Sequence, residues 1–280
     1  MTIFNNTWTN QLYHLADFLY WEPQHINRQK RKGGDMVAFE KAMEQMHSLE
    51  VPLNILFNIT MRLAPQRIKR TILNCFDVAA EFGSHIESTY IYNRLNDEKI
   101  YFIQPDAVVE SETAIVCIEL KLRAQLSLNQ VYKYLSLLGM WQTKMDIPKA
   151  PCLLLLTQKD LRAQWDSKER EKIFSGDNHL AALEYYLKSS DPPRAFAWNS
   201  VTDNHYERIK ATLRDVHLGW ASWQDVGNAL SIEWQRLNQA TPTESEEMLD
   251  ILLGDFLAEL EQRRLWQRYL SEPIDPNNRI

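Results

Sequence analysis

The sequence predicts an α/β protein in which a mixed β-sheet is flanked by helices and followed by a mostly helical C-terminal part. Three observations support this class. Residues 88–122 are rich in β-forming side chains and are broken by two turns. A helical pattern over about 128–141 follows, and a short apolar stretch, 152–157, comes next. Antiparallel strands, a crossover helix and a further strand are typical of a mixed sheet.

The composition is that of an average globular protein. Of 280 residues, 45% are hydrophobic and 24% are charged, which excludes disordered, collagen-like and coiled-coil fibrous chains. The length suits one large domain or two small ones. We expect a single domain over 1–280, with its core at about 65–160, a helical N-terminal part at about 1–64 and a mostly helical part at about 161–270.

Charge and cysteine content restrict the partners and the compartment. The 31 Lys and Arg against 37 Asp and Glu give a net charge of −6, so contact with nucleic acid requires a local basic patch. Cys75, Cys117 and Cys152 are too far apart for a metal motif and suggest reduced, buried thiols. No signal-peptide pattern and no apolar run near 18 residues is found. We expect a cytoplasmic protein with no membrane segment.

The N-terminal third is predicted to be helical. Helical spacing of apolar residues occurs at about 7–20, 36–49 and 65–82. A basic, glycine-containing link, 27–34, is either a solvated loop or a phosphate contact.

The central region is predicted to form the sheet. Strands at 88–95 and 100–109 flank a turn at 96–99, and a second turn at 111–113 leads into 114–122. The last segment is a nearly continuous apolar run, which is typical of a central strand.

Beyond residue 159 the sequence is mostly helical. A short β-like piece at 194–198 is a candidate for a further strand. Ser222 suits an N-cap before a helix at 223–230, and Thr243 with Glu246 forms a capping box before a long amphipathic helix. Trp220 and Trp223 are either core residues or a base-stacking surface.

Three charged residues stand out within the predicted strands. Asp106 follows Pro105 in an apolar strand, and Glu119 and Lys121 lie near the end of the most apolar one. Residues two apart in a strand share a face, and charges there are costly unless they are paired or bind a metal. An Asp and a Glu that converge suit Mg²⁺ or Mn²⁺, and a lysine beside the metal can orient or deprotonate a water.

These residues follow the pattern of a known superfamily. A Pro-Asp pair, twelve intervening residues and a Glu-Leu-Lys triplet resemble the PD-(D/E)xK nuclease superfamily, which has the restriction-endonuclease-like fold. A later Q-x-x-x-Y resembles the RecB and lambda-exonuclease branch. The residues concerned are Pro105, Asp106, Glu119, Leu120, Lys121, Gln130 and Tyr134.

The resemblance implies a role for each residue. Asp106, Glu119 and the backbone carbonyl of Leu120 would hold Mg²⁺ or Mn²⁺. Lys121 would serve the attacking water, and Gln130 would support the site or contact the strand being cut. The implied activity is metal-dependent hydrolysis of phosphodiester bonds, in DNA rather than RNA, in phage defence or DNA repair.

The resemblance also implies further contacts. Many members add an acid from a helix ahead of the hairpin; Glu81 and Glu87 are both candidates here, and the choice stays open. Nucleic acid would meet Tyr134, Lys133 and Arg123. A second copy of the chain or a partner protein is a further expected partner.

Each of these residues also has a purely structural interpretation. Asp106 could end a strand, and Glu119 with Lys121 could be a charge pair on an edge strand. Gln130 could complete a capping box, and Tyr134 could be a core aromatic. Two other functions therefore stay open: a nuclease-fold binding or assembly subunit without turnover, and an unrelated α/β interaction domain.

Overall fold

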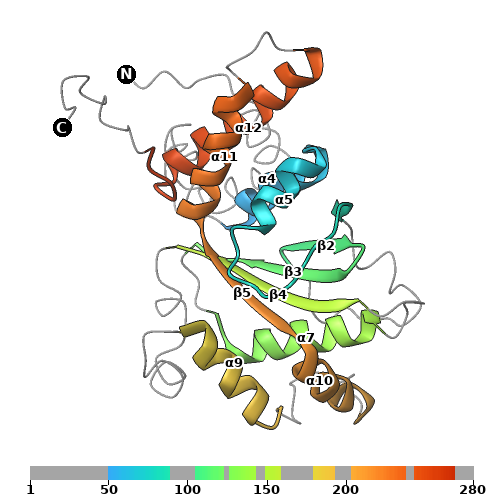
Figure 1. Ribbon diagram of the computed structural model, residues 1–280. Coiled ribbons are helices and arrows are strands. Elements are labelled where there is room, and N and C mark those ends of the chain that lie inside the picture. Colours follow the sequence, from blue (N-terminus) through green and yellow to red (C-terminus); the bar gives the residue numbers. More distant parts are fainter. Residues whose placement is uncertain are drawn as a thin grey trace, which may run out of the picture.

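The computed structural model has a five-stranded mixed sheet at its centre (Figure 1). It describes residues 50–88, 105–122, 126–142, 149–158, 179–192, 203–237 and 243–268. The strands lie in the order β1-β2-β3-β4-β5; β1, β2 and β3 are antiparallel, and β3, β4 and β5 are parallel. Their bounds are β1 (Ile86–Ser88), β2 (Ala107–Ser111), β3 (Ala114–Leu120), β4 (Ala150–Thr157) and β5 (His217–Ser222).

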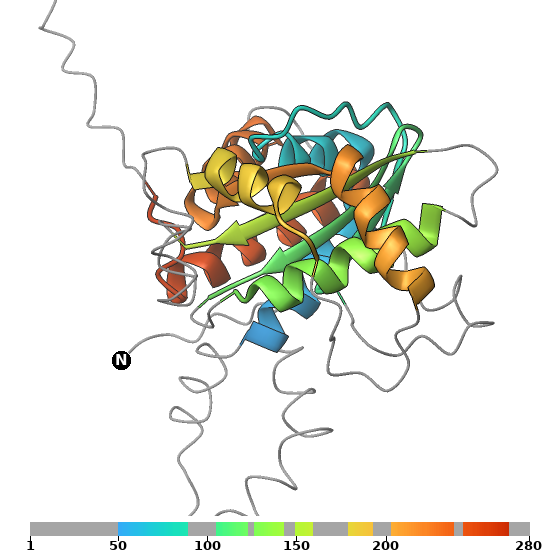
Figure 2. The same ribbon diagram turned by 90° about the horizontal axis from the view of Figure 1, so that it is seen from below.

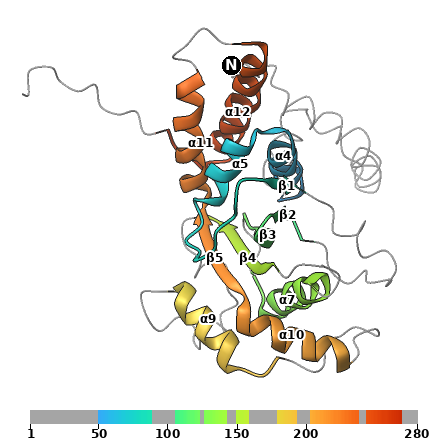
Figure 3. The same ribbon diagram turned by 45° about the vertical axis from the view of Figure 1, so that its right-hand side comes forward.

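Helices cover both faces of the sheet, which gives three layers (Figures 2 and 3). One face carries α4 (Glu50–Leu63), α5 (Gln66–Leu73), α11 (Trp223–Leu237) and α12 (Glu244–Gln262). The other face carries α7 (Leu128–Gln142), α9 (His179–Ser189) and α10 (Asp203–Asp215). The α/β class with a mixed sheet and flanking helices is thus confirmed.

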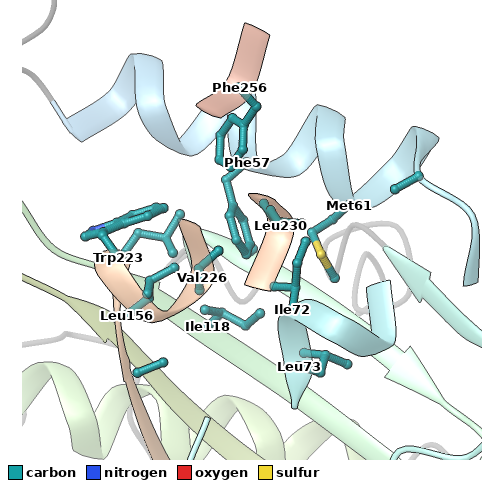
Figure 4. Close-up of a cluster of buried hydrophobic side chains, with 14 of the residues drawn as sticks. Phe57, Met61, Ile72, Leu73, Ile118, Leu156, Trp223, Val226, Leu230 and Phe256 are labelled. Carbon is teal, nitrogen blue, oxygen red and sulfur yellow. The ribbon is translucent and has the colours of Figure 1, made fainter. Parts of the chain in front are cut away.

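The alternation of side chains along β3 divides the core in two. Val116 and Ile118 pack under α4, α5, α11 and α12, whereas Ile115 and Cys117 pack under α7, α9 and α10. In the first cluster, Phe57 of α4 meets Trp223 of α11 edge to face, with ring centroids 6.0 Å apart (Figure 4). This contact fixes α4 and α11 above the sheet.

Several predicted elements have the expected place. The segment 114–122 contains β3, which ends at Leu120, and the turn before it occupies residues 112–113. The helix at 128–141 lies in α7, and 152–157 lies in β4. Both predicted caps are also present. Ser222 Oγ accepts a hydrogen bond from Asp225 N (3.1 Å) at the start of α11, and Thr243 forms a reciprocal box with Glu246 at the start of α12.

Other elements differ from the prediction. The helix expected over 65–82 ends at Leu73, because the chain beyond it turns to pair with the sheet: Asp77 N donates to Trp220 O at 3.1 Å. The helix α4 lies within the N-terminal part that was expected to be helical, but no separate helix was predicted over 50–63. β5 was also not expected, because a segment that contains Gly219 has a low preference for a strand. It forms a strand because it pairs with β4.

Some expectations lie outside the described residues. These are the helices at 7–20 and 36–49, the basic link at 27–34, the remainder of the first hairpin and the β-like piece at 194–198. All three cysteines are free, and Cys117 and Cys152 are buried. In the part of the chain that the structure describes, no helix has the length and apolarity needed to cross a bilayer.

Two glycines on neighbouring helices give a test of this packing. A Cβ on Gly227 of α11 would lie 2.3 Å from Trp266 Cδ1, whereas one on Gly254 of α12 would lie 3.2 Å from Trp234 Nε1. We expect Gly227→Ala to lower the free energy of unfolding by about 1–3 kcal/mol through overpacking. Gly254→Ala should change it by less than about 1 kcal/mol, because the gain in helix propensity offsets a mild contact. Urea denaturation of both variants measures this, and equal effects would contradict the packing of Trp266 on α11.

Candidate active site

The pairing of β2 with β3 brings the two predicted acids together. Ala107 is the register partner of Ile118, and continuing this register by one residue places Asp106 opposite Glu119. Leu120 N donates to Asp106 Oδ2 at 2.8 Å. Repulsion from Glu119 is one of the causes that raise the pKa of Asp106, which places the two carboxyl groups near each other. The carboxyl groups therefore converge at one end of the sheet, as a shared cation site requires.

Helix α4 holds Asp106 from one side. Asn54 Nδ2 donates to Asp106 Oδ1 at 2.6 Å, and Asn58 Nδ2 donates to the Asp106 backbone carbonyl at 2.6 Å. Asn58 Nδ2 also donates to Asn54 O at 2.7 Å. The two asparagines are four residues apart and share one face of α4. This face fixes both the backbone and the carboxylate of Asp106.

Helix α7 holds Glu119 from the opposite face of the sheet. Glu119 is only 1% exposed. Its Oε1 accepts from Gln130 Nε2, and its Oε2 accepts from the Tyr134 hydroxyl, which in turn accepts from Gln130 Nε2 at 3.2 Å. Lys121 Nζ lies 2.5 Å from Glu119 Oε1, and both side chains are buried. The expected shared face of Glu119 and Lys121, and of Gln130 and Tyr134, is present.

The electrostatics of the pair favour a bound cation. Burial raises the pKa of Asp106 to about 8, with repulsion from Glu119 as the next cause; the Leu120 N–H and Lys121 act in the opposite direction. Burial, followed by the nearby Glu119, also raises the pKa of Tyr134, so its hydroxyl remains a hydrogen-bond donor. When Asp106 is ionised, the two carboxyl groups share the Lys121 ammonium, and a divalent cation would offset the remaining negative charge.

The donor set fits a hard divalent cation. Asp106 and Glu119 offer carboxylate oxygens, and Asn54 Oδ1 is a buried oxygen with no hydrogen-bond partner. Oxygen ligands of this kind suit Mg²⁺ or Mn²⁺. Among the described residues, no three His, Cys, Asp or Glu side chains gather in a way that could hold a metal. Within this part of the chain, Asp106 and Glu119 are the acidic donors of the site.

The structure does not bring the other predicted residues to this point. Glu81 is exposed in the extended segment after α5. Glu87 of β1 is exposed, and its Oε1 lies 3.0 Å from His85 Nε2. Lys133 is half-buried on α7, and Arg123 lies outside the described residues. Tyr134, expected to meet nucleic acid, is 1% exposed and points at Glu119 instead.

Sequence analysis missed three residues that position the site. Asn54 and Asn58 carried a signal, since two amides four residues apart on an apolar helix are uncommon. Trp223 of α11 was expected to be either a core residue or part of a base-stacking surface. It is fully buried, and its Nε1 donates to the backbone carbonyl of Lys121 at 3.3 Å. On the other side of that backbone, Lys121 N donates to Leu156 O at 2.8 Å. The residue after β3 is therefore fixed by both β4 and α11.

In comparisons with known proteins, the chain matches no family model and shows no significant similarity to a curated protein or a solved structure. The functional argument therefore rests on the side chains themselves.

The repulsion between the two carboxyl groups predicts an unusual response to Asp106→Asn. In EDTA at about pH 9, where the Asp106 carboxyl is largely ionised, the amide removes a buried negative charge. Its oxygen can accept from Leu120 N, and its nitrogen can donate to Asn54 Oδ1 after a half-turn of the Asn54 amide. We expect the unfolding midpoint to rise by about 2–4 °C, which corresponds to about 1 kcal/mol for a chain of this size. Differential scanning fluorimetry measures the shift.

Glu110→Gln is the matched control for this prediction. Glu110 is also a largely buried carboxylate on β2, but Lys149 Nζ lies 2.8 Å from its Oε1. Removing that charge breaks an ion pair and should lower the midpoint. A fall for both variants would contradict the repulsion between Asp106 and Glu119.

Proposed function

We propose that this protein is a metal-dependent nuclease that hydrolyses phosphodiester bonds. The observation that carries the proposal is the convergence of Asp106 and Glu119, with Lys121 Nζ 2.5 Å from the Glu119 carboxylate. Acid, acid and lysine at the end of two paired strands are what the PD-(D/E)xK resemblance implies, and the restriction-endonuclease-like fold is proposed on the same grounds. The mixed sheet, with α7 crossing between β3 and β4, is compatible with that fold.

Each residue has a defined task in this proposal. Mg²⁺ or Mn²⁺, held by Asp106, Glu119 and the Leu120 carbonyl, would polarise the phosphate and offset its charge. Lys121 orients the attacking water and stabilises the negative charge that develops on the phosphate oxygens. The water oxygen forms the new bond to phosphorus and releases a proton to solvent. The bond to the leaving sugar oxygen breaks, and that oxygen takes up a proton from solvent.

The supporting residues keep Glu119 in one orientation. The Gln130 amide and the Tyr134 hydroxyl each donate to this carboxylate, so its oxygens cannot rotate away from the site. Such partners of a metal ligand commonly contribute 10–100-fold to metal affinity or activity. The Q-x-x-x-Y element is therefore proposed to position the ligand rather than to bind nucleic acid.

We propose DNA as the substrate, in phage defence or in DNA repair, on the basis of the superfamily resemblance. The net charge of −6 is unfavourable for binding along the whole surface. A local cationic groove or a partner protein, including a second copy of the chain, would then bring the nucleic acid to the site.

Lys121→Met tests the role of the lysine. Methionine keeps the unbranched apolar stem but loses the ammonium. Cleavage of linear, circular and single-stranded DNA, and of RNA, in Mg²⁺ or Mn²⁺ should fall about 100-fold or more, the range expected for a group that handles protons or charge in the transition state.

Lys149→Met provides the control. Lys149 also pairs with a glutamate, Glu110, but it lies at the opposite end of β3. Its loss should cost stability and leave cleavage by the folded protein within about twofold. Cleavage that survives Lys121→Met would point to another site or to a contaminating nuclease and would contradict the proposal.

Tyr134→Phe tests the orientation of Glu119. The ring stays in place while the hydroxyl that donates to Glu119 Oε2 is removed. We expect cleavage to fall about 10–100-fold at low metal concentration and to recover in part at high Mn²⁺, because the ligand is still present but less well held. An equal loss at all metal concentrations would contradict a role through the metal ligand.

A second candidate function is a nuclease-fold binding or assembly subunit without turnover. One observation favours it: both oxygens of Glu119 already accept hydrogen bonds from Gln130, Lys121 and Tyr134. The described part of the chain also gathers no third acid at the site. Metal binding separates the two functions, since a subunit of this kind needs neither Mg²⁺ nor Mn²⁺. A folded protein that binds no metal and cuts no substrate would favour this candidate.

A further inference from the structure

Asn54 combines two properties that neither of the predicted acids explains. Its Nδ2 donates to Asp106 Oδ1 at 2.6 Å, while its Oδ1 is buried and has no hydrogen-bond partner. A buried amide oxygen without a donor costs about 1–3 kcal/mol. The amide therefore uses a donor toward Asp106 and leaves its acceptor without a partner.

The free oxygen is close to the converging carboxyl groups. The oxygen and nitrogen of one amide are about 2.3 Å apart by covalent geometry, so Asn54 Oδ1 lies within about 5 Å of Asp106 Oδ1. The terminal torsion of asparagine is broad and roughly two-fold, so a half-turn exchanges the two atoms at little cost. Either atom of the amide can therefore face the carboxylates.

The helix that carries Asn54 is held firmly. Leu53 and Phe57 of α4 are fully buried on the core side. On the side of α4 that faces the site, Asn58 Nδ2 donates to the backbone carbonyls of Asn54 and Asp106, which links the helix to the Asp106 backbone. The amide can turn about its own torsion, whereas its Cα is fixed relative to Asp106. This is the arrangement expected of a metal ligand carried on a rigid element.

We propose that Asn54 Oδ1 is a neutral oxygen ligand of the cation, supplied by α4 beside the carboxylates of Asp106 and Glu119. The inference rests on the proposed metal-dependent function and concerns a third side-chain ligand, in addition to the Leu120 backbone carbonyl. With a cation present, the amide oxygen gains a positive partner. Without one, the amide nitrogen faces Asp106 instead.

Because Asn54 is uncharged, it lowers the affinity of the site for Mn²⁺ relative to a site with a third carboxylate. Asp106, Glu119 and Lys121 together carry one net negative charge when both carboxyl groups are ionised, and an acid at position 54 would make this two. Because affinity for hard cations follows the charge count of the ligands, Asn54 sets a weaker site than an aspartate would. Different substitutions of Asn54 are therefore expected either to weaken or to strengthen Mn²⁺ binding.

The test uses Mn²⁺ alone, without nucleic acid. Free Mn²⁺ is followed by electron paramagnetic resonance during titration of the full chain, and the unfolding midpoint is recorded with and without the metal. We expect Asn54→Ala to weaken Mn²⁺ binding about tenfold or more and Asn54→Asp to tighten it by a similar factor. An unfolded variant would only weaken Mn²⁺ binding. Tighter binding by Asn54→Asp together with weaker binding by Asn54→Ala would therefore show that the residue acts as a ligand.

Thr60→Val is the matched control. Thr60 lies on the same helix, is fully buried, and its Oγ1 also lacks a hydrogen-bond partner. The substitution keeps the shape of the side chain and should leave Mn²⁺ affinity within about twofold. Asp106→Ala, which removes a proposed carboxylate ligand, should abolish binding.

The outcomes distinguish this inference from the proposed function. Suppose that wild-type protein binds Mn²⁺ in a manner that depends on Asp106, and that both substitutions at Asn54 leave the affinity unchanged. The inference that Asn54 is a ligand is then overturned, while the proposed metal site stands. If wild-type protein shows no Mn²⁺ binding that depends on Asp106, both are overturned. If Asn54→Ala weakens Mn²⁺ binding and Asn54→Asp tightens it, the result supports both the Asn54 ligand and the proposed metal site.

Discussion

The antiparallel pairing of β2 with β3 is the constraint on which the rest of the site depends. It sets Asp106 opposite Glu119 although twelve residues separate them in the chain. A slip of one residue would turn the side chains of one strand to the other face and separate the two carboxyl groups. The register is strongly fixed, because β3 is buried along its whole length and alternates between two distinct core clusters.

The two faces of the sheet make different contributions to this point. From one face, α4 supplies two amides that hold Asp106, and from the other, α7 supplies an amide and a phenol that hold Glu119. All are neutral donors, so they orient the carboxylates without cancelling their charge. Lys121 is the cation of the group, and α11 fixes its backbone through Trp223. The architecture thus keeps a negative centre in a buried place, where a free charge is costly unless it is compensated.

The sequence predicted those parts that depend on local patterns. The apolar run of β3, the turn before it, α7, β4, the Ser222 N-cap and the Thr243 capping box follow from periodicity and cap chemistry. Prediction failed where a distant segment decided the outcome. The helix after Pro65 stops at Leu73 because the following residues pair with Trp220, far along the chain. Likewise, the segment with Gly219 is a strand only because β4 offers it a partner edge.

By itself, the sequence determined the α/β class and the four residues Asp106, Glu119, Gln130 and Tyr134 that meet at one end of the sheet, together with Lys121 beside them. Their spacing within strands and a helix fixes which side chains share a face. Only the tertiary structure decided what completes the group: α4 brings the amide of Asn54 to Asp106 across 52 positions of chain, while Glu81 and Glu87 remain exposed. The physical reason is that local periodicity specifies the face of an element, whereas the packing of buried side chains specifies which faces meet.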